Sequence, residues 1–195
     1  MAANLNQLSG GRLVLGVGVG WARQEYAALG VAFERRGRLA DDHLTAIRAA
    51  WADDADYRAG RIPIWVGGHS DAGLRRAVRH GEAWHPLRFR LGWFREALDR
   101  MKAIAAEERR PVPALAPRIA LRLTDAPITG PDRLAGEGAI DQVVDDIDQL
   151  RLLGADTVVL DPFTGDPSET RQPQAAWQAL ATVSARIPHS RTERP

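Results

Sequence analysis

Short apolar runs alternate with helix-length amphipathic segments along most of this chain, and this alternation limits the folds open to it. The runs are aliphatic and β-branched without a polar residue at every second position, which is typical of strands covered on both faces. Parallel strands need helical crossovers between them. The sequence therefore predicts an α/β fold with about five parallel strands, either a doubly wound open sheet or part of a (β/α) barrel. The expected strands are residues 13–20, 62–68, 82–86, 118–124 and 156–162.

Local signals place helices between these strands. Ser70 can cap the start of one helix, and Gly81 follows its last turn. Gly30 and Gly154 stand at the same position after two other helices. The expected helices are residues 21–30, 37–51, 71–80, 93–108, 139–153 and 174–186, with a proline-rich connector over 111–117 and a loop over 125–138.

No linker or repeat divides the chain, so we expect a single domain over residues 1–188. The polar stretch 189–195 is expected to be a disordered tail.

The composition excludes several classes of protein. Lys and Arg number 26 against 25 Asp and Glu, a net charge of +1, so we expect no nucleic-acid partner. The absence of cysteine excludes disulfides, thiolate metal sites and a cysteine nucleophile, and no side chains show the spacing of a metal site. No apolar run approaches the ~20 residues of a membrane helix, and the N-terminus lacks the pattern of a signal peptide. We expect a cytoplasmic protein.

Glycines stand where two of the expected strands end. Gly18 and Gly20 close the first strand, and Gly67 and Gly68 close the second. Glycine lets a ligand approach the main chain closely, and parallel α/β folds bind ligands at the carboxyl ends of their strands. The Gly-Gly turn runs straight into a capped helix, and the amides of such a turn and helix start form an anion site. We expect a phosphate there, with the Ser70 hydroxyl and His69 as further donors.

Other interpretations of the glycines stay open. The dinucleotide fingerprint is rejected, because it needs a glycine where Trp21 stands and no acidic residue closes a later strand at the right distance. Glycines at every second position can also serve close helix packing or a bulge. The Gly67-Gly68 pair can be a simple turn.

Three segments resemble the luciferase-like monooxygenase superfamily, in particular its flavin- or F420-dependent oxidoreductases. They are LSGGRLVLGVGVGWARQEYAALGVAFERRGR, IPIWVGGHSDAGLRRAVRHGEAWHP and VVDDIDQLRLLGADTVVLD, in order across roughly residues 8–162. The resemblance implies a TIM-type (β/α)8 barrel with FMN or F420 at its carboxyl face. It also implies hydride transfer to, or oxygen insertion into, a small organic substrate.

The resemblance also assigns binding residues, but no catalytic residue. Cofactor contacts carried over from the family fall on Gly18, Gly20, Trp21, Gly67, Gly68, His69, Ser70, Trp84 and His85. The first three match the strand end near the ring system, the next four the phosphate segment, and the last two the strand end beside the pocket. His85 can equally have a structural role before Pro86, and for Asp161, before Pro162, we favour a role in a turn.

The chain departs from the family at its start. The family's first three strands have no counterpart, and an insertion after Trp51 is reduced to ADDADYRAGR. About 250 residues is typical of a closed barrel. We therefore expect a partial barrel, an N-terminally truncated member whose strand at 13–20 lies at an open edge. Such a chain would curl into an open sheet, pair with a second copy or a related subunit, or begin further upstream.

Three functions follow from these residues. The first is a luciferase-like enzyme, either a monooxygenase acting on paired donors or an F420-dependent dehydrogenase or reductase. The second is a non-catalytic remnant or cofactor-binding subunit without turnover. The third is an unrelated (β/α) enzyme that holds a phosphorylated substrate at residues 67–70.

Overall fold

The computed structural model describes residues 1–52, 62–163 and 165–187. They divide into two units, each with its own sheet and core. The first comprises Met1–Pro86 and Ala97–Ala116, and the second Leu87–Glu96 and the chain from Pro117 onward. The expected tail at 189–195 and most of the shortened insertion lie outside the described residues, and the expectation of one domain stays a prediction.

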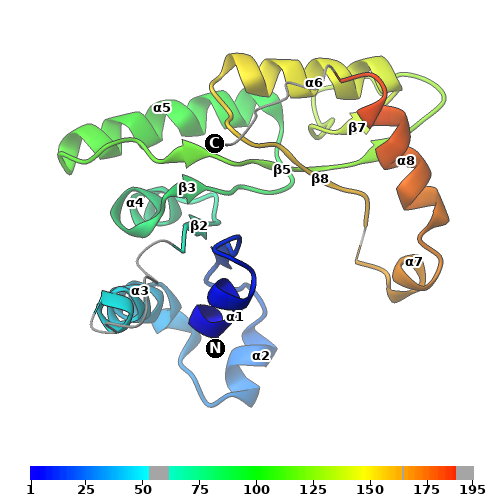
Figure 1. The fold of residues 1–195 in the computed structure, drawn as a ribbon. Coiled ribbons are helices and arrows are strands. Elements are labelled where there is room, and N and C mark those ends of the chain that lie inside the picture. The colour runs from blue at the N-terminus through cyan, green and yellow to red at the C-terminus, as the bar shows by residue number, and fades with distance from the viewer. Residues whose placement is uncertain (53–61, 164, 188–195) are drawn as a thin grey trace. The chain divides into compact units, whose positions relative to one another are not determined.

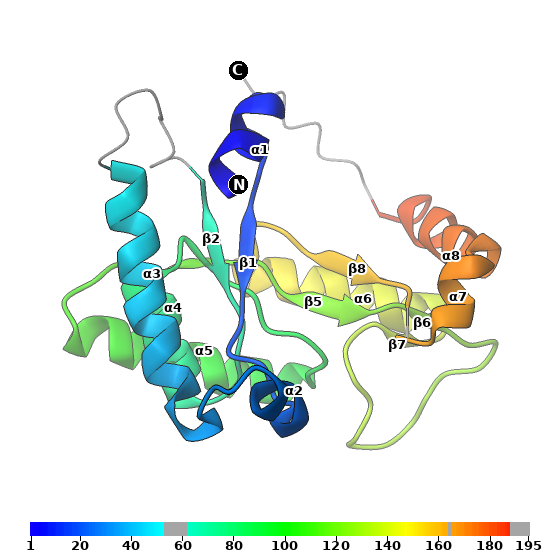
Figure 2. The same cartoon turned by 90° about the horizontal axis from the view of Figure 1, so that it is seen from below.

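The first unit contains a four-stranded parallel sheet in the order β1-β2-β3-β4, of which Figure 1 labels β2 and β3 next to α4. Its strands are β1 (Leu15–Val17), β2 (Ile64–Val66), β3 (Ala83–Trp84) and β4 (Ala114–Leu115). Figure 2 shows β1 and β2 running side by side in the same direction. The predicted parallel pairing is confirmed, and so is the open edge, because within the described residues β1 pairs only with β2.

One strand of this sheet lies where we expected only a connector. β4 consists of two residues in the proline-rich stretch, and the amides of Ala114 and Ala116 donate to the carbonyls of Glu82 and Trp84. Pro113 precedes the strand, so no proline occupies a position that must donate to the ladder. The prediction of an irregular connector is therefore wrong at these two residues.

Helices cover one face of the sheet. The core there includes fully buried Ile64, Val66, Leu74 and Trp84, since α4 packs against β2 and β3 and α3 packs against α4. The helical segments of this unit are α1 (Ala2–Leu8), α2 (Arg23–Ala28), η1 (Phe33–Arg35), α3 (Arg36–Ala52), α4 (Asp71–His80) and the end of α5 (Leu91–Glu107). None of the helices in the described part of the chain is long and apolar enough to cross a membrane.

The predicted helix ends are confirmed. Ser70 caps α4, and its side-chain oxygen accepts from the Gly73 amide at 3.2 Å. Gly30 and Gly154 follow the ends of α2 and α6 with φ values of 66° and 91°, a conformation that favours glycine.

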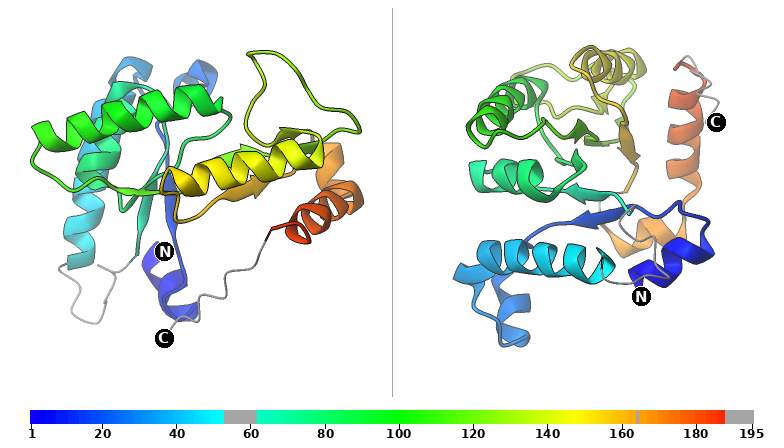
Figure 3. Two further views of the ribbon diagram at one scale, coloured as in Figure 1. Left: turned by 90° about the horizontal axis from the view of Figure 1, so that it is seen from above. Right: turned by 60° about the vertical axis from the view of Figure 1, so that its left-hand side comes forward.

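The second unit holds two short parallel ladders. β5 (Arg118–Ala120) pairs with β8 (Val159–Asp161), and β6 (Arg122–Leu123) pairs with β7 (Glu137–Gly138). Its helices are the first part of α5, α6 (Ile140–Leu152), α7 (Pro167–Arg171) and α8 (Gln174–Ser184). Figure 3 shows α6 lying along β5 and β8.

The expected strand at 118–124 is divided because its partner changes. The Leu121 amide donates to the Asp161 carbonyl, whereas the next amide, of Arg122, donates to the Gly136 carbonyl. That second partner lies at the end of a stretch that we expected to be an irregular loop, where β7 forms instead. A two-residue ladder carries too little local pattern to be seen in the sequence.

A buried ion pair fixes the loop before α6. Asp146 is fully buried, and its two oxygens accept from the Arg133 guanidinium at 2.7 Å each and from the Gly136 amide at 2.8 Å. The hydrogen bonds to Asp146 raise the pKa of Arg133 above its ordinary value, so the guanidinium keeps its charge. The loop that carries Gly136 is therefore tied to α6 by one carboxylate.

We expect Asp146→Ala to lower the free energy of unfolding by about 3–5 kcal/mol, because it leaves Arg133 without its buried partner. Asp148→Ala on the same helix is the matched control. It removes an exposed pair with Arg151, and should cost at most about 1 kcal/mol. Urea unfolding followed by circular dichroism measures both, and equal losses would contradict the role of the buried pair.

Histidine 80 makes the stability of the first unit depend on pH. Burial at the end of α4 lowers the pKa of His80 from its ordinary 6.5, and Arg110, Arg76 and Arg79 add to this, against the opposing effect of Asp41. As the pH falls through 6.5, the unfolded chain gains a proton that the folded chain resists, so the free energy of unfolding decreases. Above that pH the group is neutral in both states and contributes no difference.

We therefore expect His80→Gln to reduce the loss of stability between pH 7.5 and 5.5 (values of about one unit either side of the ordinary pKa). His43→Gln, at an exposed position on α3, is the control. Thermal unfolding at each pH gives the comparison. The same pH dependence in wild type and His80→Gln would exclude His80 as the group responsible.

Candidate functional site

The carboxyl ends of β1, β2 and β3 bring the predicted site residues to one edge of the sheet. The Gly67 amide donates to the Val17 carbonyl at 2.8 Å, and the His85 amide donates to the Val66 carbonyl at 2.9 Å. The two glycine segments and the end of β3 therefore follow neighbouring strands on the same edge, which is the placement the sequence predicts.

One face of the sheet is left bare near this edge. Gly16 and Gly18 are exposed, and a Cβ added at either would meet no atom within 4 Å. Gly20 differs from them, because its φ is 67° and a Cβ there would approach the Tyr26 ring at 3.3 Å. Gly16 and Gly18 thus leave the main chain open, while Gly20 makes a turn.

An aromatic pair stands on the same face. Trp65 is the register partner of Gly16, and its ring lies 5.4 Å from the ring of His85, tilted by 40°. Nδ1 of His85 lies 2.5 Å from the Ala116 carbonyl oxygen. A carbonyl accepts only from a donor, so the neutral ring carries its proton on Nδ1 and its lone pair on Nε2. The imidazole is therefore held in one tautomer and one orientation.

In the turn after β2, the main chain at Gly68 packs closely against the main chain at Gly73 in α4. Gly68 has φ 130°, and a Cβ there would lie 3.3 Å from the Cα of Gly73 in the first turn of α4. The side-chain oxygen of Ser70 accepts a hydrogen bond from the Gly73 amide, and the Ser70 carbonyl accepts one from the Leu74 amide. Both neighbours must therefore stay small for the loop to rest on the helix.

Two amides at this helix start remain available. In the part of the chain that the structure describes, those of Asp71 and Ala72 donate no hydrogen bond. They lie at the positive end of the helix dipole, which favours an anion. The Asp71 carboxylate would oppose an anion, but it lies 3.1 Å from Nε of Arg100, which offsets its charge.

The remaining predicted residues differ in exposure. Trp84 is fully buried on the helix-covered face, and its indole nitrogen donates to the Gly68 carbonyl at 3.0 Å. It therefore holds the turn in place from behind. Trp21 is 87% exposed just beyond the end of β1, and His69 is exposed in the turn.

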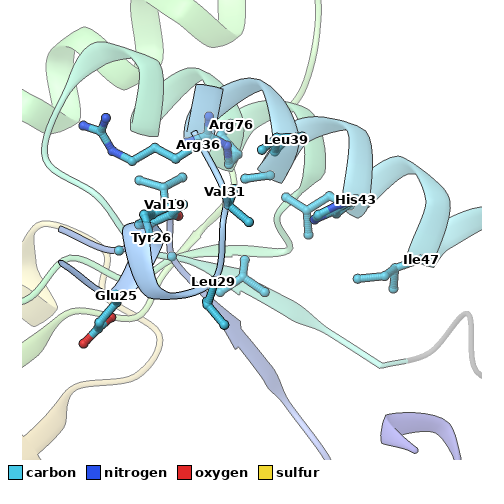
Figure 4. Close-up of a pocket in the computed structure, with 15 residues that line it drawn as sticks. Val19, Glu25, Tyr26, Leu29, Val31, Arg36, Leu39, His43, Ile47 and Arg76 are labelled. Carbon is cyan, nitrogen blue, oxygen red and sulfur yellow. The ribbon is translucent and has the colours of Figure 1, made fainter. Parts of the chain in front are cut away.

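A cavity of about 470 Å³ lies beside the end of β1, between that strand, α2 and α3 (Figure 4). Its walls are mostly aliphatic, from both Val17 and Val19 and from the helices. Figure 4 shows Leu39, His43 and Ile47 of α3 lining it. Nothing local in the sequence shows that the space between β1 and α3 is incompletely filled.

Two further residues of the site were missed by the sequence analysis. Trp65 could have been found, because it alternates with Ile64 and Val66 and must face the opposite side of the sheet. Arg36 lies against the cavity with its guanidinium 3.8 Å above the Phe33 ring, a contact that has no signature in the sequence.

Comparison with known proteins agrees with this geometry. The family model described as luciferase-like monooxygenase matches residues 1–126. The phthiodiolone/phenolphthiodiolone dimycocerosates ketoreductase of Mycobacterium kansasii is 30% identical over 164 residues, which cover 73% of this chain and 43% of the relative. The chain thus spans less than half the length of this curated relative.

Solved structures show the same fold. An F420-dependent secondary alcohol dehydrogenase, in complex with an F420-acetone adduct, has a TM-score of 0.65 at 14% identity, covering 82% of this chain and 67% of its own. The EDTA monooxygenase of Chelativorans sp. BNC1 has a TM-score of 0.63 at 17% identity, covering 98% of this chain and 71% of its own. The predicted class, an α/β fold of the partial (β/α)8 type, is confirmed.

We expect Trp84→Phe to lower the free energy of unfolding by about 1–3 kcal/mol, because the Gly68 carbonyl loses its donor and the smaller phenyl ring leaves part of the indole's space unfilled. Trp177→Phe is the matched control, since Trp177 is 62% exposed, and should change stability by at most about 0.5 kcal/mol. Urea unfolding by circular dichroism gives both values, and equal values would show that the indole hydrogen bond does not stabilise the turn.

Proposed function

Because this chain belongs to the luciferase-like monooxygenase family, we propose that it is the cofactor-binding part of an oxidoreductase that uses F420 or FMN on a small organic substrate. The observation that carries the proposal is the meeting of two bare glycine segments with a capped helix start at one sheet edge. When bound, such a cofactor supplies hydride transfer or the activation of oxygen.

The turn after β2 fits the phosphate of either cofactor. The amides of Asp71 and Ala72 and the hydroxyl of Ser70 would hold the phosphate oxygens, with His69 beside them. Gly67 leaves the main chain bare beside this turn, and a Cβ there would lie 3.4 Å from the His85 carbonyl oxygen, at van der Waals contact. The residues present therefore fit an anion, and Trp84 keeps their main chain in position from the buried side.

The bare face of β1 fits a flat ring system. Gly16 and Gly18 offer main chain without side chains, and the Trp65 and His85 rings stand on the same face. Trp21, just past the strand end, contributes an exposed indole. The contact between Nδ1 of His85 and the Ala116 carbonyl fixes the orientation of this ring beside the bare face.

The ketoreductase relative supports hydride transfer to a carbonyl compound as the reaction. We infer that the whole protein works in the cytoplasm, and that the open edge of β1 is completed by a second copy, a related subunit or further chain. A cofactor-binding subunit without turnover is the second candidate, and the observation in its favour is that same unpaired edge.

Titration with FMN and with F420, followed by absorbance and fluorescence, tests the proposal. We expect Gly68→Ala to weaken binding at least tenfold, because its Cβ presses on Gly73 and its φ of 130° is strained for alanine. Gly154→Ala is the matched control, since it has φ 91°, open space and no place in the site. Ser70→Ala should weaken binding and remove a helix cap worth about 1 kcal/mol.

Saturable binding of one cofactor, lost in Gly68→Ala and kept in Gly154→Ala, supports the proposal and identifies the cofactor. Absence of binding to the folded chain, or equal binding by the two alanine variants, refutes it. Reduction of a test ketone by the loaded protein then separates an enzyme from a binding subunit.

A further inference from the structure

The second unit has a cavity of its own, of about 300 Å³, that is lined by three arginines. Arg118, Arg122 and Arg88 contribute to its wall, and Asp161 is the carboxylate among the lining residues. It lies where β5 and β8 end and the chain continues beyond them. The cofactor proposal uses none of these residues.

The topology explains why these side chains converge. Arg118 and Arg122 are four residues apart in an extended stretch, so they share one face, while Ile119 and Leu121 are buried on the other. A parallel bridge pairs Leu87 with Arg118, which brings Arg88 alongside. The cluster therefore forms because the bridge brings together two segments that are about thirty residues apart in the sequence.

Charge on this cluster is only partly balanced. Nε and Nη2 of Arg118 donate to one oxygen of Asp161 at 3.0 and 2.6 Å, while the other oxygen accepts from the Phe163 amide. Arg122 has a looser partner, with its Nε 3.6 Å from Glu137. Two carboxylates thus face three guanidinium groups, which leaves one positive charge.

Arg88 carries that charge in an unusual conformation. Its φ is 52°, it is exposed, and within the described residues its side chain has neither an ion pair nor a hydrogen bond. A non-glycine residue in the left-handed region is uncommon and calls for a functional or structural reason. No interaction of its side chain with the described residues supplies one.

We propose that this cavity binds the anionic group, phosphate or carboxylate, of a small molecule. Guanidinium groups present paired N–H donors that match two oxygens of either group, and a single anion neutralises the remaining charge. Asp161 orients Arg118 for this purpose and also holds the turn after β8. The inference does not rest on the cofactor proposal, whose phosphate would lie at residues 67–73 in the first unit.

The test is a titration of the full chain with inorganic phosphate and, separately, with succinate, at constant ionic strength, followed by amide chemical shifts in NMR spectra. We expect saturable shifts at residues 88, 118–122 and 161–163, weakened at least fivefold in Arg88→Gln. Arg109→Gln is the matched control, because Arg109 is also exposed with φ 52° but does not line the cavity. Arg122→Gln should weaken binding as well.

The tighter of the two probes identifies the class of ligand, and either result supports the proposal. Shifts confined to residues 67–73 would overturn it while leaving the cofactor site intact. Absence of saturable shifts at the arginines, or equal affinities for Arg88→Gln and Arg109→Gln, would overturn it too. Loss of cofactor binding in Gly68→Ala with phosphate shifts retained at residue 88 would show that the two sites stand independently.

Discussion

Parallel pairing of three very short strands is the constraint on which the candidate site depends. Each strand has only two or three residues, so the placement of everything beyond it rests on a few main-chain hydrogen bonds. The bonds from Gly67 to Val17 and from His85 to Val66 align the points at which the chain leaves the sheet. The register pairs Gly16 with Trp65, which are almost fifty residues apart in the sequence. Without this pairing, the two glycine segments would not lie side by side.

One face of the sheet stabilises the fold, and the other leaves main chain open for a ligand. The helix-covered face is closed by Ile64, Val66 and Trp84, which have no exposed surface, and their burial supplies the stability of this region. On the other face Gly16 and Gly18 stand in place of such side chains, and the Trp65 ring contacts the His85 ring. Trp84 contributes to both, because it belongs to the core and its indole nitrogen also donates a hydrogen bond to the Gly68 carbonyl. The bare face can exist because the opposite face stabilises the sheet.

The sequence predicted the features that depend on local pattern. The helix boundaries at Ser70, Gly30 and Gly154 follow from the conformations these residues allow, and the parallel strands follow from their apolar runs. β4 and β7 could not be predicted, since their two-residue ladders form only because a partner strand is already in place. The resemblance supplied the binding residues, and their binding role is still a prediction.

Other parts of the sites were hidden for a different reason. The contact between Arg118 and Asp161 joins residues that are 43 positions apart in the sequence. The cavity beside α3 exists because no side chain fills the space between that helix and the end of β1. Spacing alone could have shown that Arg118 and Arg122 share a face, with apolar residues between them. It could not have shown that Arg88 joins them, because that depends on a bridge formed at Leu87.

The two anion sites proposed for this chain would bind through different kinds of donor. At the start of α4 the donors are main-chain amides, which cannot move without unwinding the helix and which carry only partial charge. Such a site suits one group of fixed shape, as a resident cofactor presents. The donors beside β5 are full charges on long side chains, of which Arg88 has no anchoring contact in the described residues. Mobile guanidinium groups tolerate ligands of varied shape, which suits a group that must enter and leave. The division follows from the donors themselves, whatever the ligands prove to be.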